Sequence, residues 1–203
     1  IATIPKQKGQ EHDGVNTNAI DPLLVNQWAL SNTGQSGGTV DADINGPESW
    51  AINNGSLDFV IGVIDSGVDY NHNDLIGNLW TNSLEIAGNG IDDDGNGVVD
   101  DYYGAAFIST PSSVKTPSSH GTHVAGTIGA TNNNETGISS IAGGNGTPGS
   151  GVKLMSCQIL KSLTSTGGEV ASDPFIAAAI KYGADNGAVI SQNSWGYAVE
   201  IGR

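Results

Sequence analysis

The chain has few basic residues. Seven lysines and arginines stand against 21 aspartates and glutamates, which gives a formal net charge of -14 over 203 residues. Nucleic acids and anionic membrane surfaces repel a chain this acidic, so neither is expected as a partner. The sequence also lacks an apolar run of about eighteen residues, and we therefore expect no membrane-spanning segment. Strong acidity is instead compatible with solubility and with divalent cations.

Cysteine is almost absent as well. The single thiol, Cys157, excludes an internal disulfide framework. It lies in an apolar stretch at 152–160, where a buried structural thiol is expected rather than a reactive one. The chain begins at Ile1 and shows no signal-peptide pattern. We expect either that a leader has been removed or that the sequence is a fragment.

Glycine, by contrast, is abundant, with thirty residues that indicate many tight turns. Between the turns, stretches at 57–65, 152–160 and 188–194 are predicted to be strands, the first of them covered on both faces. Helices are expected at 45–54, 120–130 and 171–186. Strands that alternate with helices predict an α/β fold with a doubly wound, mostly parallel sheet. Residues 1–20 are expected to form a loose lead-in, and the apolar side chains of 21–30 to pack onto the body.

Two residues in this pattern are candidates for chemistry. Asp65 ends the clearest strand, and sites in open α/β sheets form at the carboxyl ends of strands; the alternative is a turn-forming aspartate. His120 begins a predicted helix, where the helix dipole favours the neutral imidazole that a general base requires. The alternative for His120 is a capping or core histidine. His123 could join His120 as a metal ligand, but no HExxH pattern or nearby cysteine supports zinc.

Three segments carry a family resemblance. They are Val-Ile-Asp-Ser-Gly-Val-Asp at 63–69, His-Gly-Thr-His-Val-Ala-Gly at 120–126 and Asn-Ser-Trp-Gly at 193–196. In this order they resemble the subtilases, a family of serine endopeptidases that act on polypeptides. The resemblance implies a subtilisin-like three-layer fold, with residues 21–203 as an incomplete catalytic domain. Together with the acidity, it implies an extracellular, secreted protein.

The resemblance also implies residue roles. Asp65 would orient the imidazole, and His120 would be the general base and acid of an Asp-His-Ser triad. Ser194, Trp195 and Gly196 would pair with the substrate main chain as an added strand, unless they are a plain strand end. None of the serines present matches the family's nucleophile motif. We therefore expect the fold to be truncated before the serine, the fragment alone to be inactive, and a missing C-terminal segment to be its partner.

An acidic, glycine-rich loop at 85–104 is the second strong signal. Its segment 89–101 resembles the first half of an EF-hand calcium loop, with oxygen donors at alternate positions and Gly97 at the sharp turn. Tyr103 stands where an EF-hand has its bidentate glutamate, which excludes a true EF-hand. The predicted calcium ligands are Asp92, Asp94, Asn96, the Val98 carbonyl, and Asp100 or Asp101. So many carboxylates would repel one another without a cation, although a solvated acidic turn is the alternative.

The family resemblance implies a second calcium site. Asp74 matches a position that ligates calcium in the family, and the loop at 132–137 would be its partner. Two other functions stay open at this point. One is a non-catalytic, calcium-binding, subtilase-like interaction module, and the other is a metal hydrolase that uses His120 and His123.

Overall fold

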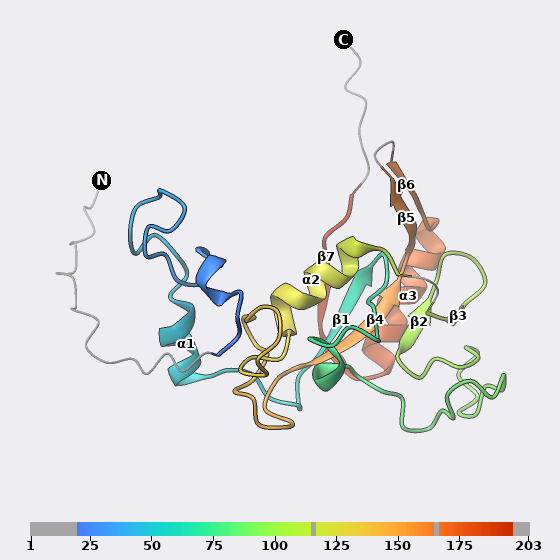
Figure 1. The fold of residues 1–203 in the computed structure, drawn as a ribbon. Coiled ribbons are helices and arrows are strands. Elements are labelled where there is room, and N and C mark those ends of the chain that lie inside the picture. Colours follow the sequence, from blue (N-terminus) through green and yellow to red (C-terminus); the bar gives the residue numbers. More distant parts are fainter. Residues whose placement is uncertain (1–19, 115–116, 165–166, 197–203) are drawn as a thin grey trace, which may run out of the picture.

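The main sheet has five strands. A computed structural model describes residues 20–114, 117–164 and 167–196, and within them the strand order is β3-β2-β4-β1-β7 (Figure 1). The strands are β1 (Val60–Asp65), β2 (Gly104–Ala106), β3 (Ser112–Ser113), β4 (Lys153–Gln158) and β7 (Ala188–Asn193). All neighbours pair in parallel except β3, which is antiparallel to β2. The predicted mostly parallel α/β sheet is confirmed.

The helices fall within a few residues of their predicted bounds. They are α1 (Gly46–Ile52), α2 (Ser119–Gly129) and α3 (Asp173–Asp185), with short 3-10 turns at Leu24–Asn26 and Ile76–Asn78. The side chain of Ser118 caps α2 by accepting a hydrogen bond from the backbone N–H of His120. A separate antiparallel pair, β5 (Leu160–Thr164) and β6 (Gly167–Val170), follows β4 directly. None of the helices formed by the described residues is long and apolar enough to cross a membrane.

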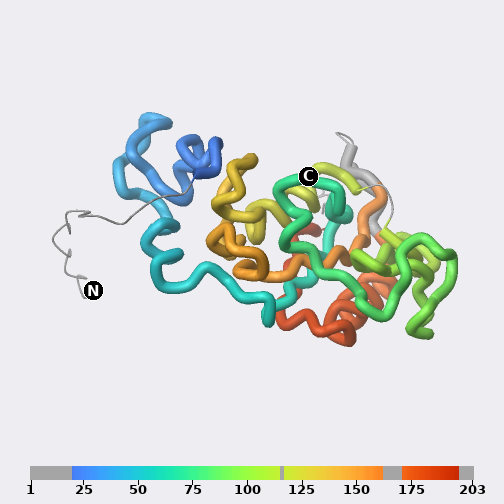
Figure 2. Tube along the Cα trace, turned by 60° about the horizontal axis from the view of Figure 1, so that its bottom comes forward, coloured from blue at the N-terminus to red at the C-terminus, as the bar shows by residue number. Residues whose placement is uncertain are grey.

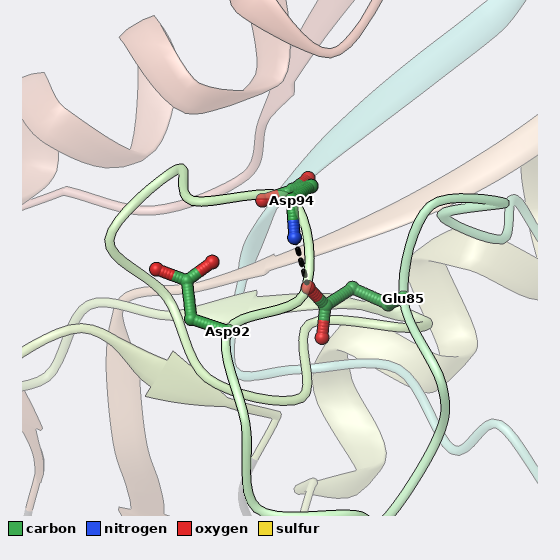
Figure 3. Close-up of side chains that lie close together, drawn as sticks. All are labelled: Glu85, Asp92 and Asp94. Carbon is green, nitrogen blue, oxygen red and sulfur yellow. Dashed lines mark hydrogen bonds between the residues drawn. The ribbon is translucent and has the colours of Figure 1, made fainter.

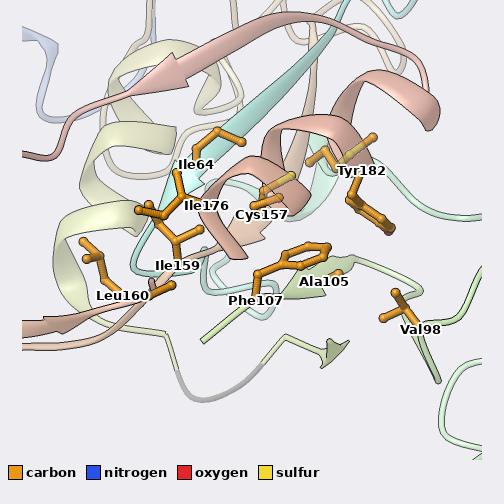
Figure 4. Close-up of a cluster of buried hydrophobic side chains, with 12 residues drawn as sticks. Ile64, Val98, Ala105, Phe107, Cys157, Ile159, Leu160, Ile176 and Tyr182 are labelled. Atoms are coloured by element: carbon orange, nitrogen blue, oxygen red, sulfur yellow. The ribbon is translucent and has the colours of Figure 1, made fainter. Parts of the chain in front are cut away.

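The alternation of side chains along β1 produces the layers. Ile61 and Val63 belong to a buried cluster that includes Ala125 of α2. Ile64 points to the opposite face, into a cluster that includes Ala179 of α3 (Figure 4). The sheet is therefore covered on both faces, which is why β1 is apolar at nearly every position. This three-layer arrangement is the one that the sequence predicts.

The N-terminal segment 20–54 differs from expectation. Leu23, Val25 and Trp28 were expected to pack onto the body, but they are 47%, 69% and 53% exposed. The segment is attached by polar contacts instead: buried Asp21 accepts hydrogen bonds from two backbone N–H groups and a hydroxyl of the 133–139 loop. The prediction of apolar packing was therefore wrong for Leu23, Val25 and Trp28, although Leu30 of the same segment is buried. The segment and the acidic loop lie at opposite ends of the molecule (Figures 1 and 2).

Candidate functional site

Asp65 and His120 meet at the carboxyl edge of the sheet. Asp65 is the last residue of β1, the strand between β4 and β7, and it is fully buried. His120 lies in the first turn of α2, and its Nδ1 is 2.7 Å from Oδ1 of Asp65. The side chain of His120 is 40% exposed. The structure thus brings together the two residues that the sequence singles out, at hydrogen-bond distance.

The surroundings of Asp65 hold its carboxylate in place. The backbone N–H of Ser66 donates to Oδ1 at 2.6 Å, while Oδ2 is buried and has no hydrogen-bond partner among the described residues. A carboxylate that accepts from Nδ1–H fixes the imidazole tautomer, which leaves Nε2 free to accept a proton. Because the imidazole is partly exposed, a reacting group can reach it from solvent. The pair can therefore supply general acid–base chemistry.

His123 does not join His120 in a metal site. It is exposed on α2 and lines a cavity of about 560 Å³ together with His72 and Leu23. Across the described ranges, no group of three or more close metal-ligating side chains includes either His120 or His123. The geometry therefore offers no support for the metal-hydrolase alternative.

The acidic loop brings three carboxylates together (Figure 3). One oxygen from each of Glu85, Asp92 and Asp94 lies within 4.8 Å of the others. Glu85 is only 5% exposed; its Oε1 accepts from the backbone N–H groups of Asp93 and Asp94 at 2.8 and 3.2 Å, but its Oε2 is buried without a partner. An unsatisfied buried carboxylate oxygen is costly unless a cation or donor meets it. The residues present therefore fit a divalent cation.

Sequence reasoning missed Glu85 because it precedes the 89–101 motif. The only signal was an acidic side chain shortly before the motif, and its approach to Asp92 and Asp94 depends on how the loop folds. Burial acts to raise the pKa of Asp94, yet hydrogen bonds from Asn82 and Asn96 outweigh it and lower that pKa below its usual value. The structure thus favours the ionised form of Asp94 even before a cation binds.

Asp100 and Asp101 have other partners. Asp100 accepts from the backbone N–H groups of residues 89 and 90, both at 3.0 Å. Asp101 is fully buried and accepts from the Tyr182 hydroxyl at 2.6 Å and from the amide groups of Asn96 and Asn82 at 2.9 and 3.0 Å. Neither belongs to the group of three carboxylates. The structure thus gives both residues a place in the hydrogen bonding of the loop.

The other two predicted ligands, Asn96 and Val98, are linked by a 2.8 Å hydrogen bond from the Val98 N–H to the Asn96 side-chain oxygen.

Asp74 lies against the loop that the sequence pairs with it. It is buried, its Oδ1 accepts from the side-chain amide of Asn134 at 2.9 Å, and its Oδ2 accepts from the N–H of Ile138 at 3.0 Å. The structure therefore places Asp74 beside 132–137, as expected, with both oxygens hydrogen-bonded.

Ser194, Trp195 and Gly196 follow β7 outside any strand. Ser194 and Gly196 are exposed, whereas Trp195 is partly buried against the cluster shown in Figure 4. The hydroxyl of Ser194 accepts from the side-chain amide of Gln192 at 2.7 Å. Gly196 has open space around the position of a Cβ atom. The segment thus continues from the edge strand, at a place that another chain can reach.

The fold and this pair define an α/β protein with a carboxylate–imidazole dyad at the carboxyl edge of a parallel sheet. Comparison with known proteins identifies the family: the model of the subtilase family matches residues 57–202, which is most of the chain, and the chain belongs to this family. The resemblance stated from the three motifs is confirmed.

Individual relatives match over shorter stretches. Subtilisin-like protease 1 of Plasmodium vivax is 46% identical over 82 residues, which are 40% of this chain and 13% of that protein. The same-named protein of Plasmodium falciparum (isolate 3D7) is 49% identical over 77 residues, 37% of this chain and 11% of that protein. Human neuroendocrine convertase 2 is 39% identical over 74 residues, 36% and 12% of the two chains. The matched region thus spans about an eighth of these relatives.

A solved structure of a protease from Pseudoalteromonas arctica PAMC 21717 is also similar. It shares 22% sequence identity with a TM-score of 0.43, and the match covers 85% of this chain and 57% of that one.

Proposed function

We propose that this chain supplies the aspartate and histidine of a subtilisin-like serine endopeptidase that acts on polypeptides outside the cell. The observation that carries the proposal is the 2.7 Å contact between Nδ1 of His120 and Oδ1 of Asp65. Membership of the subtilase family supports it. The three motifs appear in the order in which that family has them.

The proposed roles follow from depth and geometry. Asp65, fully buried, accepts the Nδ1 proton and stabilises the imidazolium. His120, partly exposed, takes the proton of a serine through Nε2 and later returns it to the leaving amine. The nucleophile is a serine on a segment that follows this chain. Without it, the general base has nothing to activate, and an acyl-enzyme cannot form.

The edge of the sheet supports two binding roles. β7 is the outer strand on its side of the described sheet, and its apolar residues Val189 and Ile190 are exposed. A cavity of about 140 Å³ lies beside it against α3. An unpaired, apolar edge is a template for another strand, so the serine-bearing segment docks on β7. The substrate main chain pairs with the residues that follow β7, which are Ser194, Trp195 and Gly196.

Calcium is the proposed cofactor of the acidic loop. The proposed ligands are Asp92, Asp94, Asn96, the Val98 carbonyl and Glu85, with Asp100 and Asp101 holding the loop in shape. The unpartnered, buried Oε2 of Glu85 supports a cation there. Calcium takes oxygen ligands of this kind, and it would hold the loop together by neutralising its carboxylates. A second calcium site at Asp74 stays a proposal that rests on the family resemblance.

The test combines this chain with the serine-bearing segment. The chain alone should not hydrolyse peptides, whereas the mixture should do so and should react with a fluorophosphonate probe. His120→Ala should lower the rate of hydrolysis by a factor on the order of a thousand or more. His123→Ala is the matched control and should leave the rate of hydrolysis unchanged. Robust hydrolysis by the chain alone, lost in His120→Ala, would contradict the proposal. Hydrolysis that needs His123 and a metal would favour the metal-hydrolase alternative.

One observation keeps a second function in view. The three-carboxylate group around Glu85 does not involve the Asp65–His120 pair, so a calcium-binding interaction module without catalysis would keep this loop. A mixture that binds calcium and forms a stable complex, but never reacts with the probe, would identify that function.

A further inference from the structure

Ser66 contacts both sides of the carboxylate–imidazole pair. It follows Asp65 directly and is fully buried. Its backbone N–H donates to Oδ1 of Asp65 at 2.6 Å. Its hydroxyl oxygen accepts from the backbone N–H of Gly121, the residue after His120, at 2.9 Å. One residue therefore holds the carboxylate with its backbone and the start of α2 with its side chain.

Ser118 adds a second arm to this contact. Its hydroxyl lies 2.7 Å from that of Ser66, and its backbone N–H donates to the Ser66 carbonyl at 3.1 Å. The Ser118 hydroxyl also accepts from the N–H of His120 at 3.4 Å. The first N–H groups of a helix have no partner within the helix. Here two of these N–H groups have serine acceptors: that of His120 donates to Ser118, and that of Gly121 donates to Ser66. The two serine hydroxyls are hydrogen-bonded to each other directly after β1.

The packing leaves little freedom at this junction. A Cβ atom on Gly121 would lie 2.4 Å from the carbonyl oxygen of Gly67, so α2 rests directly on the turn that follows β1. On the other side, the side-chain amide of fully buried Gln158 donates to the Ser66 carbonyl at 3.1 Å. Ser66 is thus fixed by β4 and in turn fixes α2.

We infer that Ser66 is a positioning residue whose hydroxyl sets the separation of Asp65 and His120. Without the hydroxyl, the Gly121 N–H loses its acceptor at a buried helix start, and Ser118 keeps only its backbone hydrogen bond to the Ser66 carbonyl. The Asp65–His120 hydrogen bond would then hold a junction that has lost two of its side-chain contacts. The catalytic meaning of this role rests on the proposed function, but the geometry can be tested without any hydrolysis.

The experiment follows the Nδ1 proton of His120 by NMR in the chain labelled with 15N-histidine. In the unaltered protein this proton should give a slowly exchanging, low-field signal because it is shared with a buried carboxylate. In Ser66→Ala the signal should move to higher field, and the proton should exchange with solvent about tenfold faster, as expected for the loss of one hydrogen bond. Ser66→Cys, which keeps the volume but accepts hydrogen bonds weakly, should behave like Ser66→Ala.

Ser140→Ala is the matched control. Ser140 is a buried serine whose hydroxyl donates to the Ala130 carbonyl at 2.7 Å, beyond the other end of α2. It should lower the melting temperature by a similar amount and leave the His120 signal unchanged. If Ser66→Ala does not fold, Ser118→Ala removes one arm and should still shift the signal. A His120 signal that is unaltered in both Ser66→Ala and Ser118→Ala would overturn the inference.

The complete enzyme provides a second readout that separates the two proposals. Ser66→Ala should lower kcat about tenfold with little change in KM, because positioning acts on the reacting groups rather than on substrate binding. If the enzyme proves inactive for other reasons, the NMR result still decides the role of Ser66. If hydrolysis occurs but the signal and kcat do not respond to Ser66→Ala, the inference fails while the proposed function stands.

Discussion

The hydroxyl of Tyr182 on α3 donates a 2.6 Å hydrogen bond to Oδ2 of Asp101, at the end of the acidic loop. Both groups are buried, and Tyr182 packs at 5.4 Å from the ring of Phe107 in the cluster beneath α3. This bond ties a loop of mostly polar residues to the apolar core. Burial, and then the hydrogen bond and charge of Asp101, raise the pKa of Tyr182 far above its ordinary value.

Alkaline stability should depend on Tyr182. Because its pKa is raised in the folded state, its contribution is complete below the unfolded-state pKa of about 10 and declines as the pH rises above it, by up to about 1.4 kcal/mol per pH unit. Tyr182→Phe should lower the free energy of unfolding at pH 7 by about 1–3 kcal/mol and make its decline above pH 10 shallower. Urea unfolding between pH 7 and 11 measures both, with Tyr70→Phe as control. An equally steep decline in Tyr182→Phe would contradict the assignment.

Glu85→Gln should change stability in opposite directions with and without calcium. In chelator, the variant should unfold at a higher temperature, because a buried carboxylate with an unpartnered oxygen is replaced by a neutral amide. In calcium, the unaltered protein should gain stability and the variant should gain little, since a cation that binds only the folded state raises its melting temperature. Differential scanning calorimetry under both conditions tests the two signs.

Glu48→Gln on α1, remote from the acidic loop, is the control for that experiment and should respond to calcium as the unaltered protein does. If neither protein responds to calcium, the site itself is refuted. If both respond equally, Glu85 is not a ligand, and the loop binds the cation through its other oxygens.

The thiol of Cys157 should report unfolding. Cys157 is fully buried in β4, and burial raises its pKa to about 12. Since the thiolate is the reactive form, a disulfide reagent at pH 8 should modify the folded chain at least a hundredfold more slowly than the chain in urea. Stopped-flow labelling measures the ratio. Rapid labelling of the folded chain would show that β4 opens readily or that the thiol is exposed.

The β7 edge should make the isolated chain self-associate. Val189 and Ile190 are 62% and 51% exposed on β7, whose outer edge has no neighbouring strand in the described sheet, and such an edge is a known route to edge-to-edge pairing. Ile190→Lys should shift the chain toward the monomer in light scattering after gel filtration, because a charged side chain on an edge opposes pairing. Val40→Lys changes an equally exposed residue of the N-terminal segment and should have a smaller effect. Identical association in both variants would place the contact elsewhere.

The sequence predicts those parts of the structure that depend on short, local residue patterns. The apolar run before Asp65 predicts a buried strand, and Ser118 before His120 fits a helix start, so the pair could be located from strand-end and helix-start rules. Tertiary contacts could not be predicted in the same way. Glu85 reaches its partners only through the folding of the loop, and Asp21 finds backbone donors far away in the sequence. Trp28 shows the reverse error, because its hydrophobicity alone does not say which surface meets it.

The pair at the sheet edge is also divided by depth. The Asp65 side chain is 1% exposed, whereas the His120 side chain is 40% exposed. A reagent dissolved in water can therefore react with the His120 imidazole but cannot reach the Asp65 carboxylate that is hydrogen-bonded to it. Acylating reagents selective for histidine should mark this junction in the folded chain, while carboxyl-directed coupling reagents pass over it. The side chain that solvent reaches, His120, is therefore different from the side chain that is held in the core, Asp65. Water can contact the imidazole without disturbing the position of the carboxylate.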